Sequence, residues 1–379
     1  MVASPRFRPE DAASTHHGGI MHGMTRPFAV ATTDRAGCAP RRPKSLSVAV
    51  SLMAAALLPL SAAAAFAEIF ACTSNSEVRV FADDAGVSAL PIRTIAGPST
   101  GIAECYGLAL DNWHNELWVT TQSTIRVFHA TDDGDVAPLR TITGFGFAIS
   151  LAVDVEADEV YVGTVGGAVF VYSRTASGSP TPLHSIQGGL TGLATVAGLF
   201  VDRVNDELYV ENYSGSVAVF ARSADGNVAP LRPFASFTRP FGLVVDPWAN
   251  EVFVASGDAA IKVHNRTGAA LRQIAGSGTF LTQSTGLCLL EDGTVLAGNQ
   301  FGSATTNDAV FGYPRAQNGA ASPTFELLFA APLTRAIWGI ASTHAFECGE
   351  GQTASRCLFR NSFEGGDLSD WSASIGVTP

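Results

Sequence analysis

The feature that most constrains the fold of this chain is a segment that it repeats. "GLALDNWHNELWVT" begins at residue 107, and near-copies begin at residues 150, 198 and 242. The last residue of the first apolar stretch is an aspartate in every copy, and these aspartates recur with a period of about 45 residues: Asp111, Asp154, Asp202 and Asp246. Such a period is typical of stacked or radially arranged units that cannot bury their apolar faces alone.

Each repeated unit reads as four short strands. An apolar stretch ends in Asp, a tight turn follows, and segments such as "ELYV" and "SVAVF" then alternate between the two faces of a strand. Alternation with many β-branched and aromatic residues predicts half-buried strands. A second repeated segment, "ADGNVAPLR" at 224–232 with a near-copy at 132–140, supplies a polar connection and a fourth strand. No segment has a sustained helical period.

The ends of the repeat region determine how the units close. Four full units are followed by a degenerate fifth that begins with "GLCLLEDGTVLAG" at 286–298. Residues 68–95 lack a first strand, and residues 336–342 form a first strand with nothing after it. Because the two fragments complete one another, we predict an all-β fold, a six-bladed β-propeller over residues 68–343, whose ring is closed by the C-terminal strand.

The repeated units resemble NHL-type repeats of exported bacterial six-bladed propellers, and the likeness covers residues 68–343. The resemblance implies that the first strand of each blade lines a central channel, and that the loops from fourth to first and from second to third strand form the ligand face. Such propellers serve mainly as binding platforms, and only some of them are enzymes. Within residues 344–379, "SFEGGDLSDWS" resembles a short FESGD-like tail of exported bacterial proteins. We interpret it as a tail or sorting element.

The N-terminal residues 1–67 have the pattern of a targeting segment. Basic "RRPK" at 41–44 precedes an apolar run from Leu46 to Phe66, and "AFA" at 65–67 is a small-residue cleavage signal. An uncleaved anchor is the alternative, since about twenty apolar residues can span a bilayer; Pro59 and the cleavage triplet favour removal. We therefore expect export to the periplasm or the extracellular space, with no membrane span after signal cleavage.

The charge of the chain limits its partners. The net charge is −11, and Lys262 is the only lysine after residue 67. Without a basic patch to neutralise phosphates, nucleic acid is excluded as a partner. The acidic residues of the first turns and of the repeated loop are interpreted as one solvated face. We expect a monomer whose ligand is a protein, a peptide or a glycan.

The predicted channel strands carry almost no groups for acid–base chemistry or metal binding, which need Asp, Glu or His converging on one point. We therefore predict a non-catalytic binding or scaffold module without a cofactor. Large aromatic residues stand just before the channel strands, where they either wedge between blades or form an aromatic mouth with two arginines. The candidate ligand-binding residues are Tyr106, Phe147, Phe241, Trp338, Arg239 and Arg335.

The alternative is a metal-dependent lactonase-like hydrolase or a lyase that uses the channel mouth. Gluconolactonase-like six-bladed propellers hold a divalent cation there with Glu, Asn and Asp oxygens, the ligands that Ca²⁺ prefers. The residues of this chain that map near the predicted mouth are Glu104, Glu211, Asn212 and Asn299. For Asn212, turn chemistry favours a structural role as a hairpin cap.

Export to an oxidising compartment permits disulfides. Cys72 begins a loop of the closing blade and Cys105 precedes the next channel strand, so both are expected on the mouth face of neighbouring blades. We predict the bridges Cys72–Cys105 and Cys348–Cys357. Cys288, inside a channel strand, is expected to be a buried thiol that behaves as a small apolar residue.

Overall fold

The computed structural model describes residues 67–73, 75–300, 309–329, 337–343 and 345. Residues 1–66 and 346–379 lie outside the described residues, and with them the predicted signal segment, the FEGGD tail and the pair Cys348–Cys357. In the described part of the chain, no helix is long and apolar enough to span a bilayer.

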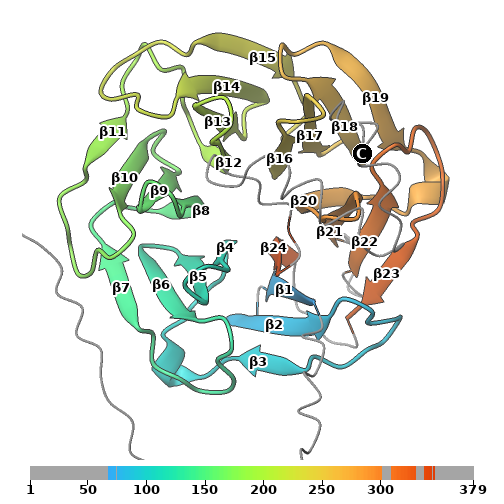
Figure 1. The fold of residues 1–379 in the computed structure, drawn as a ribbon, viewed down its shortest axis with the longest axis horizontal. Helices are drawn as coiled ribbons and strands as arrows, with labels where there is room; N and C mark the ends of the chain where they lie inside the picture. Colours follow the sequence, from blue (N-terminus) through green and yellow to red (C-terminus); the bar gives the residue numbers. More distant parts are fainter. Residues whose placement is uncertain (1–66, 74, 301–308, 330–336, 344, 346–379) are drawn as a thin grey trace, which may run out of the picture. The chain divides into compact units, whose positions relative to one another are not determined.

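Twenty-four strands form six four-stranded antiparallel sheets, which are arranged as blades around a channel (Figure 1). Blade 1 consists of β4 (Gly107–Asp111), β5 (Glu116–Thr121), β6 (Thr124–His129) and β7 (Arg140–Thr143). Blade 2 consists of β8 (Ala148–Asp154), β9 (Glu159–Thr164), β10 (Val169–Ser173) and β11 (His184–Ile186). Blade 3 consists of β12 (Val196–Asp202), β13 (Glu207–Asn212), β14 (Ser216–Ala221) and β15 (Arg232–Ser236). Blades 4 and 5 consist of β16 (Leu243–Asp246), β17 (Glu251–Ser256), β18 (Ala260–Asn265) and β19 (Ala270–Ala275); and β20 (Gln283–Leu289), β21 (Thr294–Gln300), β22 (Ala309–Pro314) and β23 (Phe325–Leu328). Two short 3₁₀ helices, η1 (Pro98–Thr100) and η2 (Ser277–Thr279), precede blades 1 and 5.

Blade 6 joins the two ends of the ring. The C-terminal β24 (Ile337–Ser342) pairs with β1 (Glu68–Thr73), which continues to β2 (Glu77–Ala82) and β3 (Arg93–Ile95). In Figure 1 the last strand lies beside the first near the channel, and β3 lies at the rim. The prediction of six blades, with the closing strand supplied by the C-terminal fragment, is confirmed.

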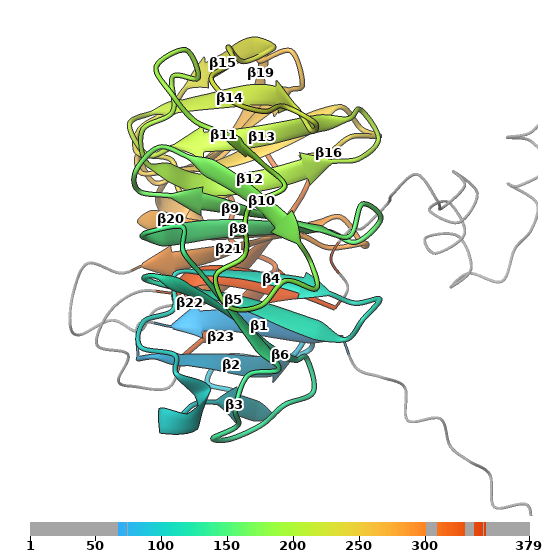
Figure 2. The ribbon, with the colours of Figure 1, turned by 90° about the vertical axis from the view of Figure 1, so that its left-hand side faces the viewer.

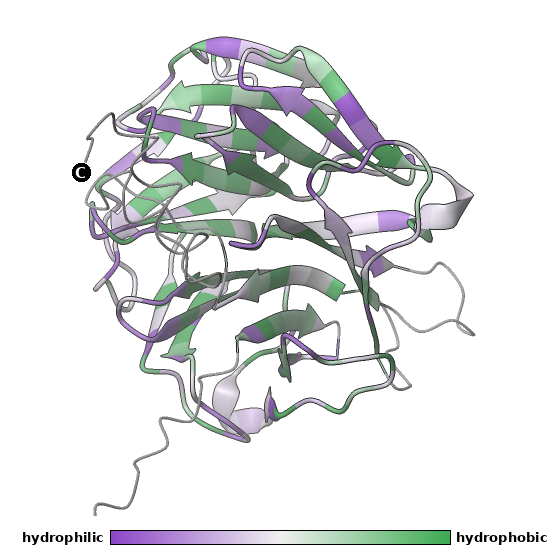
Figure 3. Ribbon diagram, turned by 45° about the vertical axis from the view of Figure 1, so that its right-hand side comes forward, coloured by the Kyte–Doolittle hydropathy of each residue, from purple (hydrophilic) through white to green (hydrophobic). Residues whose placement is uncertain are grey.

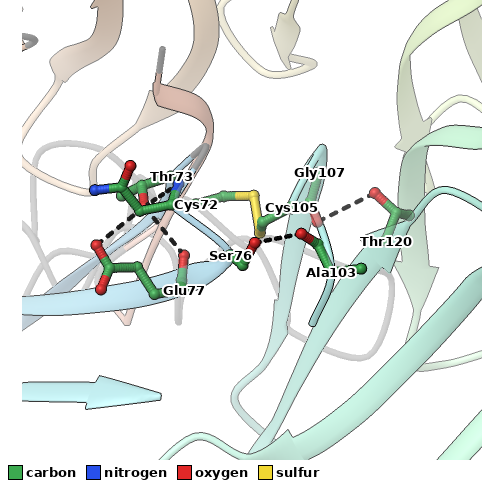
Figure 4. The surroundings of a disulfide bond; sticks show 9 residues. Cys72, Thr73, Ser76, Glu77, Ala103, Cys105, Gly107 and Thr120 are labelled. Carbon is green, nitrogen blue, oxygen red and sulfur yellow. Dashed lines mark hydrogen bonds between the residues drawn. A yellow bond between two sulfur atoms is a disulfide. The ribbon is translucent and has the colours of Figure 1, made fainter. Parts of the chain in front are cut away.

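A disulfide links the closing blade to its neighbour. Cys72 in β1 is bonded to Cys105, two residues before β4, with the two Cα atoms 5.5 Å apart (Figure 4). This is the bridge predicted from the sequence. Cys288 is a buried thiol outside any disulfide, also as expected.

The core lies between the blades. Each sheet buries side chains against both neighbouring sheets, and the side view in Figure 2 shows the stacked edges of the blades. Apolar residues follow the strands, whereas hydrophilic residues gather at the strand ends and loops (Figure 3). The largest side chains without solvent contact include Trp118, Tyr161 and Tyr209 on the second strands of blades 1 to 3. This arrangement explains the near-continuous apolar second strands, because both of their faces are buried.

The repeated loop covers the outer edge of the preceding blade. Gly226 in the loop of blade 3 donates its N–H to Ser185 O and accepts from Gln187 N, while the Asp225 carboxylate accepts the Ser185 N–H. Equivalent bridges join Gly134, Gly178 and Gly319 to the fourth strands β3, β7 and β19. The glycines have φ between 73° and 77°, a left-handed conformation that explains why the turn is written with Gly each time. No such bridge to β15 or to β23 occurs in the described part of the chain.

Arginines connect neighbouring blades at the turns that follow the first strands. After the third strand of blades 2 to 5, an arginine reaches back to the repeated aspartate of the preceding blade: Arg174 to Asp111 (3.7 Å), Arg222 to Asp154 (2.7 Å), Arg266 to Asp202 (3.3 Å) and Arg315 to Asp246 (2.6 Å). A second set of arginines, on fourth strands, pairs with the glutamate that opens the second strand of the same blade: Arg93 with Glu68, Arg140 with Glu116, Arg232 with Glu207 and Arg272 with Glu251.

The expectation that these acids belong to a solvated face is therefore wrong for the repeated aspartates. All four are at most 2% exposed. Asp154, for example, accepts the N–H groups of Glu156 and Ala157 through one oxygen and pairs with Arg222 through the other. A buried carboxylate is stable here because it caps its own turn and meets a guanidinium of the next blade.

Two substitutions separate these contributions of Asp154. We expect Asp154→Ala to lower the free energy of unfolding by about 3 kcal/mol, because it removes the turn cap and leaves Arg222 facing Asp206 alone. Asp154→Asn keeps an acceptor for the turn and loses only the charge, so its cost should be smaller. Urea denaturation of the two variants measures both effects.

The matched control is Asp133→Ala, which removes an exposed carboxylate that accepts the N–H of Thr94 at 2.9 Å. Its cost should be about 1 kcal/mol or less. Equal costs for Asp133→Ala and Asp154→Ala would contradict the role assigned to the buried aspartates.

Candidate functional site

The first strands build the channel in successive layers. The innermost strands run in the same direction, so equivalent residues of the blades lie at the same level. One level is a ring of branched aliphatic residues, here called the leucine ring. Its members line both a space toward the mouth and a space toward the first turns: Leu108, Leu151, Leu199, Leu243, Leu287 and Ile340. This leucine ring separates a pocket of ≈90 Å³ at the mouth from a cavity of ≈210 Å³ that reaches the first turns.

Aromatic residues fill much of the mouth. Ile149, Ala197 and Phe241, one from each of blades 2 to 4, form a small buried apolar cluster. Tyr106 of blade 1 and Tyr213 of blade 3 pack against this cluster, and the rings of Tyr213 and Phe241 lie 6.3 Å apart, edge to face. Two of the predicted ligand residues, Tyr106 and Phe241, are thus brought to one place. They belong both to a packed cluster and to the lining of the mouth pocket.

Tyr106 has a polar and an apolar neighbour. Its hydroxyl donates to the carboxylate of Glu104, which also accepts from Gln122 Nε2 at 2.9 Å. Burial, followed by the hydrogen bond to Glu104, raises the pKa of Tyr106, so the hydroxyl stays protonated. Phe147 of the neighbouring blade contacts the Tyr106 ring edge to face at 5.3 Å and is 41% exposed. The pair presents an aromatic surface with an adjacent carboxylate.

Arg239 stands exposed just before this cluster. Its backbone is left-handed, with φ 41°, although a proline follows it. Gly257 allows this conformation, since its N–H donates to Thr238 O at 2.6 Å and a side chain at Gly257 would meet the carbonyls of Thr238 and Arg239. Arg335 lies outside the described residues, as does the side chain of Trp338, whose backbone belongs to β24.

The structure adds one aromatic residue that the sequence reasoning missed. The loops before the first strands of blades 1, 3 and 5 share a pattern: "GPSTGI" at 97–102, "GGLTGL" at 188–193 and "GSGTFL" at 276–281. In each, the threonine hydroxyl donates to the carbonyl of the first glycine. The next residue is left-handed, and it is Gly101, Gly192 and Phe280 in turn, with φ of 62°, 67° and 59°. Phe280 is 49% exposed. Comparison of these three loops would have identified it.

The four residues of the metal alternative have separate partners. Asn212 accepts the Ala194 N–H and donates to Gly192 O and Ser216 Oγ, so it holds its loop as a structural cap. Asn299 does the same for the loop of blade 5, where its amide oxygen accepts the Thr282 N–H. Glu104 is bound as described above. Over the described residues, no group of three or more His, Cys, Asp or Glu side chains could hold a metal ion.

Glu211 is the exceptional carboxyl group of the mouth. It has no solvent exposure, one oxygen accepts the Gly242 N–H at 2.6 Å, and the other has no hydrogen-bond partner among the described residues. Burial raises the pKa of Glu211 to about 8, despite the hydrogen bond from Gly242. The group is therefore a neutral acid near pH 7. A β-carbon at Gly198 would meet its oxygen at 2.4 Å, which explains the glycine there.

Comparisons with known proteins do not show a family for this chain. No family model matches the chain, and no curated protein is similar to it in sequence. Among solved structures, it is similar to the WD40 β-propeller domain of Doa1, with 15% identity and a TM-score of 0.49, over 72% of this chain and 82% of that one. A similarity this distant says nothing about a ligand.

The buried acid predicts a pH dependence of stability. Because the pKa of Glu211 is raised in the folded state, the contribution of this group to the free energy of unfolding is fully present below its ordinary pKa of 4.5. This contribution is lost as the pH rises to about 8. Glu211→Gln resembles the protonated acid and lacks this loss. We expect the free energy of unfolding of Glu211→Gln, relative to that of the wild type, to increase by a few kcal/mol between pH 4.5 and about 8. Urea denaturation measures this difference.

Glu207→Gln is the control, because the pKa of Glu207 is lowered where that of Glu211 is raised. Burial alone would raise the pKa of Glu207, but its ion pairs with Arg232 and Arg266 outweigh burial and lower it. Its stabilising effect is therefore present above its ordinary pKa, and the cost of Glu207→Gln should stay constant from pH 5 upward. A similarly constant difference for Glu211→Gln would show that the Glu211 pKa is not raised.

Proposed function

We propose that this propeller is an exported, non-catalytic binding module that holds a peptide or glycan across the mouth of its channel. The observation that carries the proposal is the aromatic surface there. Tyr106 and Phe147 lie edge to face, with Phe147 41% exposed, above a pocket of only ≈90 Å³. Aromatic rings give large contact area at a low entropy cost, and both sugars and peptide side chains stack on them.

The size of the mouth pocket favours a ligand that lies on the surface. Tyr106 and Phe241 fill the entrance, and the leucine ring lies directly behind them. Small-molecule sites usually have volumes of about 300–1,000 Å³. A pocket this small therefore fits one protruding group, such as a side chain or a single sugar substituent, while the rest of the ligand contacts the loops.

Two residues at the mouth face support the same proposal because they are held in costly backbone conformations. Phe280 replaces the glycine of its sister loops, and Arg239 is left-handed before a proline. A non-glycine residue in this region costs about 1–2 kcal/mol, and such strain clusters at ligand sites. The ring of Phe280 contacts that of Phe311 at 6.1 Å but is 49% exposed, and Arg239 is exposed, so both side chains remain open to a ligand.

Phe280→Gly tests whether Phe280 lowers the stability of the fold and strengthens ligand binding. The variant should be more stable than the wild type by about 1 kcal/mol, because glycine is unstrained at this φ. It should nevertheless bind at least about tenfold more weakly, as should Tyr106→Ala. A screen of glycan and random-peptide arrays with the mature wild type supplies the probe, and surface plasmon resonance with that probe compares the variants.

Trp248→Ala is the aromatic control, because Trp248 is 50% exposed in the first turn of blade 4, at the other end of the first strand from Phe241. Its binding should match the wild type. Unchanged affinity in both mouth variants would refute the proposed site. Calcium-dependent lactonase or esterase activity that disappears in Glu211→Gln would instead favour the metal-dependent enzyme.

A further inference from the structure

The larger cavity lies on the other side of the leucine ring, toward the first turns. Its volume is ≈210 Å³, and the walls behind the ring are almost entirely aliphatic, with Leu110, Val153, Val201, Val245 and Leu289 from five successive blades. We call this space the chamber: the leucine ring lies at its inner end, and its charged residues, Asp202 and Arg203, lie where β12 meets the first turn of blade 3. Aliphatic side chains in a concave space beside a few polar groups can hold the chain of a small molecule, and ≈210 Å³ limits that molecule to a short one.

One basic side chain reaches this chamber. Arg203, in the first turn of blade 3, is the only Lys or Arg among the lining residues, and its side chain is 12% exposed. The nearest carboxylate oxygen, on Glu156, is 3.7 Å from Nη1, which is too far for a hydrogen bond. Nη1 has no hydrogen-bond partner within the described part of the chain. The equivalent residues of blades 2 and 4 are Val155 and Pro247, so the arginine is a special feature of this turn.

The acids closest in the turns do not oppose an anion strongly. Asp202, the only acid in the lining, is bound by Asn205 through backbone N–H and Nδ2 and pairs with Arg266 at 3.3 Å. Asp154 and Asp246 of the flanking blades are likewise paired with arginines. The charges of these three aspartates are therefore largely compensated. Arg203, whose nearest acid is Glu156 at 3.7 Å, is the basic side chain in the lining of the chamber.

We propose that this chamber binds a small monocarboxylate with an aliphatic chain, its carboxylate on Arg203 and its chain directed toward the leucine ring. At about 30 Å³ for each small group, the volume of one liquid water, the chamber of ≈210 Å³ holds about seven such groups. The fitting ligands are therefore acids of about six to eight carbons. This site is independent of the mouth, because the leucine ring separates the two spaces.

Octanoate and 1-octanol are the probes, and isothermal titration calorimetry on the mature protein is the measurement. The wild type should bind octanoate saturably at one site and should bind octanol more weakly. Arg203→Gln should weaken octanoate by about tenfold or more, because a charge-assisted hydrogen bond is lost, and should leave octanol unchanged. Ala152→Phe places a ring in the chamber and should abolish binding of both.

Arg79→Gln is the charge-matched control, since Arg79 pairs with Glu77 and lines neither space of the channel; it should bind like the wild type. Melting curves confirm that each variant is folded, and Ala341→Leu replaces Ala152→Phe as the filled variant if the latter does not fold. The proposal is overturned if octanoate fails to bind up to its solubility limit. It is also overturned if Arg203→Gln binds octanoate as tightly as the wild type, or if the filled variant still binds it.

Discussion

The whole ring depends on the pairing of its last strand with its first. Every blade buries both faces against its neighbours, so a ring without β24 would leave an apolar face and an open edge at β1. The Glu68 N–H donates to Thr343 Oγ1 across 275 residues, which shows how distant in sequence the closing contacts are. Contacts of such separation form late in folding, because loop-closure entropy must first be overcome. The disulfide from Cys72 to Cys105 reinforces the neighbouring junction, between blades 6 and 1.

The contacts between neighbouring blades differ in chemistry, as one equivalent position of the second strands shows. Cys72 stands opposite Gly339 in blade 6, and the corresponding second-strand residues of blades 1 to 3 are Thr120, Gly163 and Glu211. Cys72 is disulfide-bonded to Cys105 of the next blade, and Glu211 accepts the Gly242 N–H of the next blade. Gly163 leaves room for Ser150 to donate to Val196 O. A covalent bond, a neutral carboxyl and a serine thus serve one purpose. The raised pKa of Glu211 follows from this structural position inside a junction.

The fold could be predicted because the repeat determines it, and the cysteine pair followed from the predicted strand order. The ion pairs between blades were missed, since the arginine lies in one unit and its aspartate in the unit before. The repeat nevertheless contained the signal. Four junctions have both the aspartate and the arginine. The other two lack both, since Leu290 and Asp83 stand at these positions in one and Thr343 and Ala130 in the other. Tyr106 and Phe241 do lie together at one end of the channel, as their positions before the first strands indicated. The distribution of space along the channel depends on side-chain volumes. No pattern of single residues reveals that the larger cavity lies at the opposite end.

The uncovered fourth strand of blade 3 has a consequence for how copies of this protein meet. In blades 2, 4 and 6 the outward N–H of the fourth strand is accepted by a side chain of the next loop, as Ser185 is by Asp225. Blade 3 has Pro233 at the position of Ser185, opposite Ala218, and a proline has no N–H to offer. An extended chain from another molecule would therefore find an incomplete row of donors there. A single imino acid therefore makes this rim a poorer template for strand addition, in a molecule otherwise built from stacked sheets.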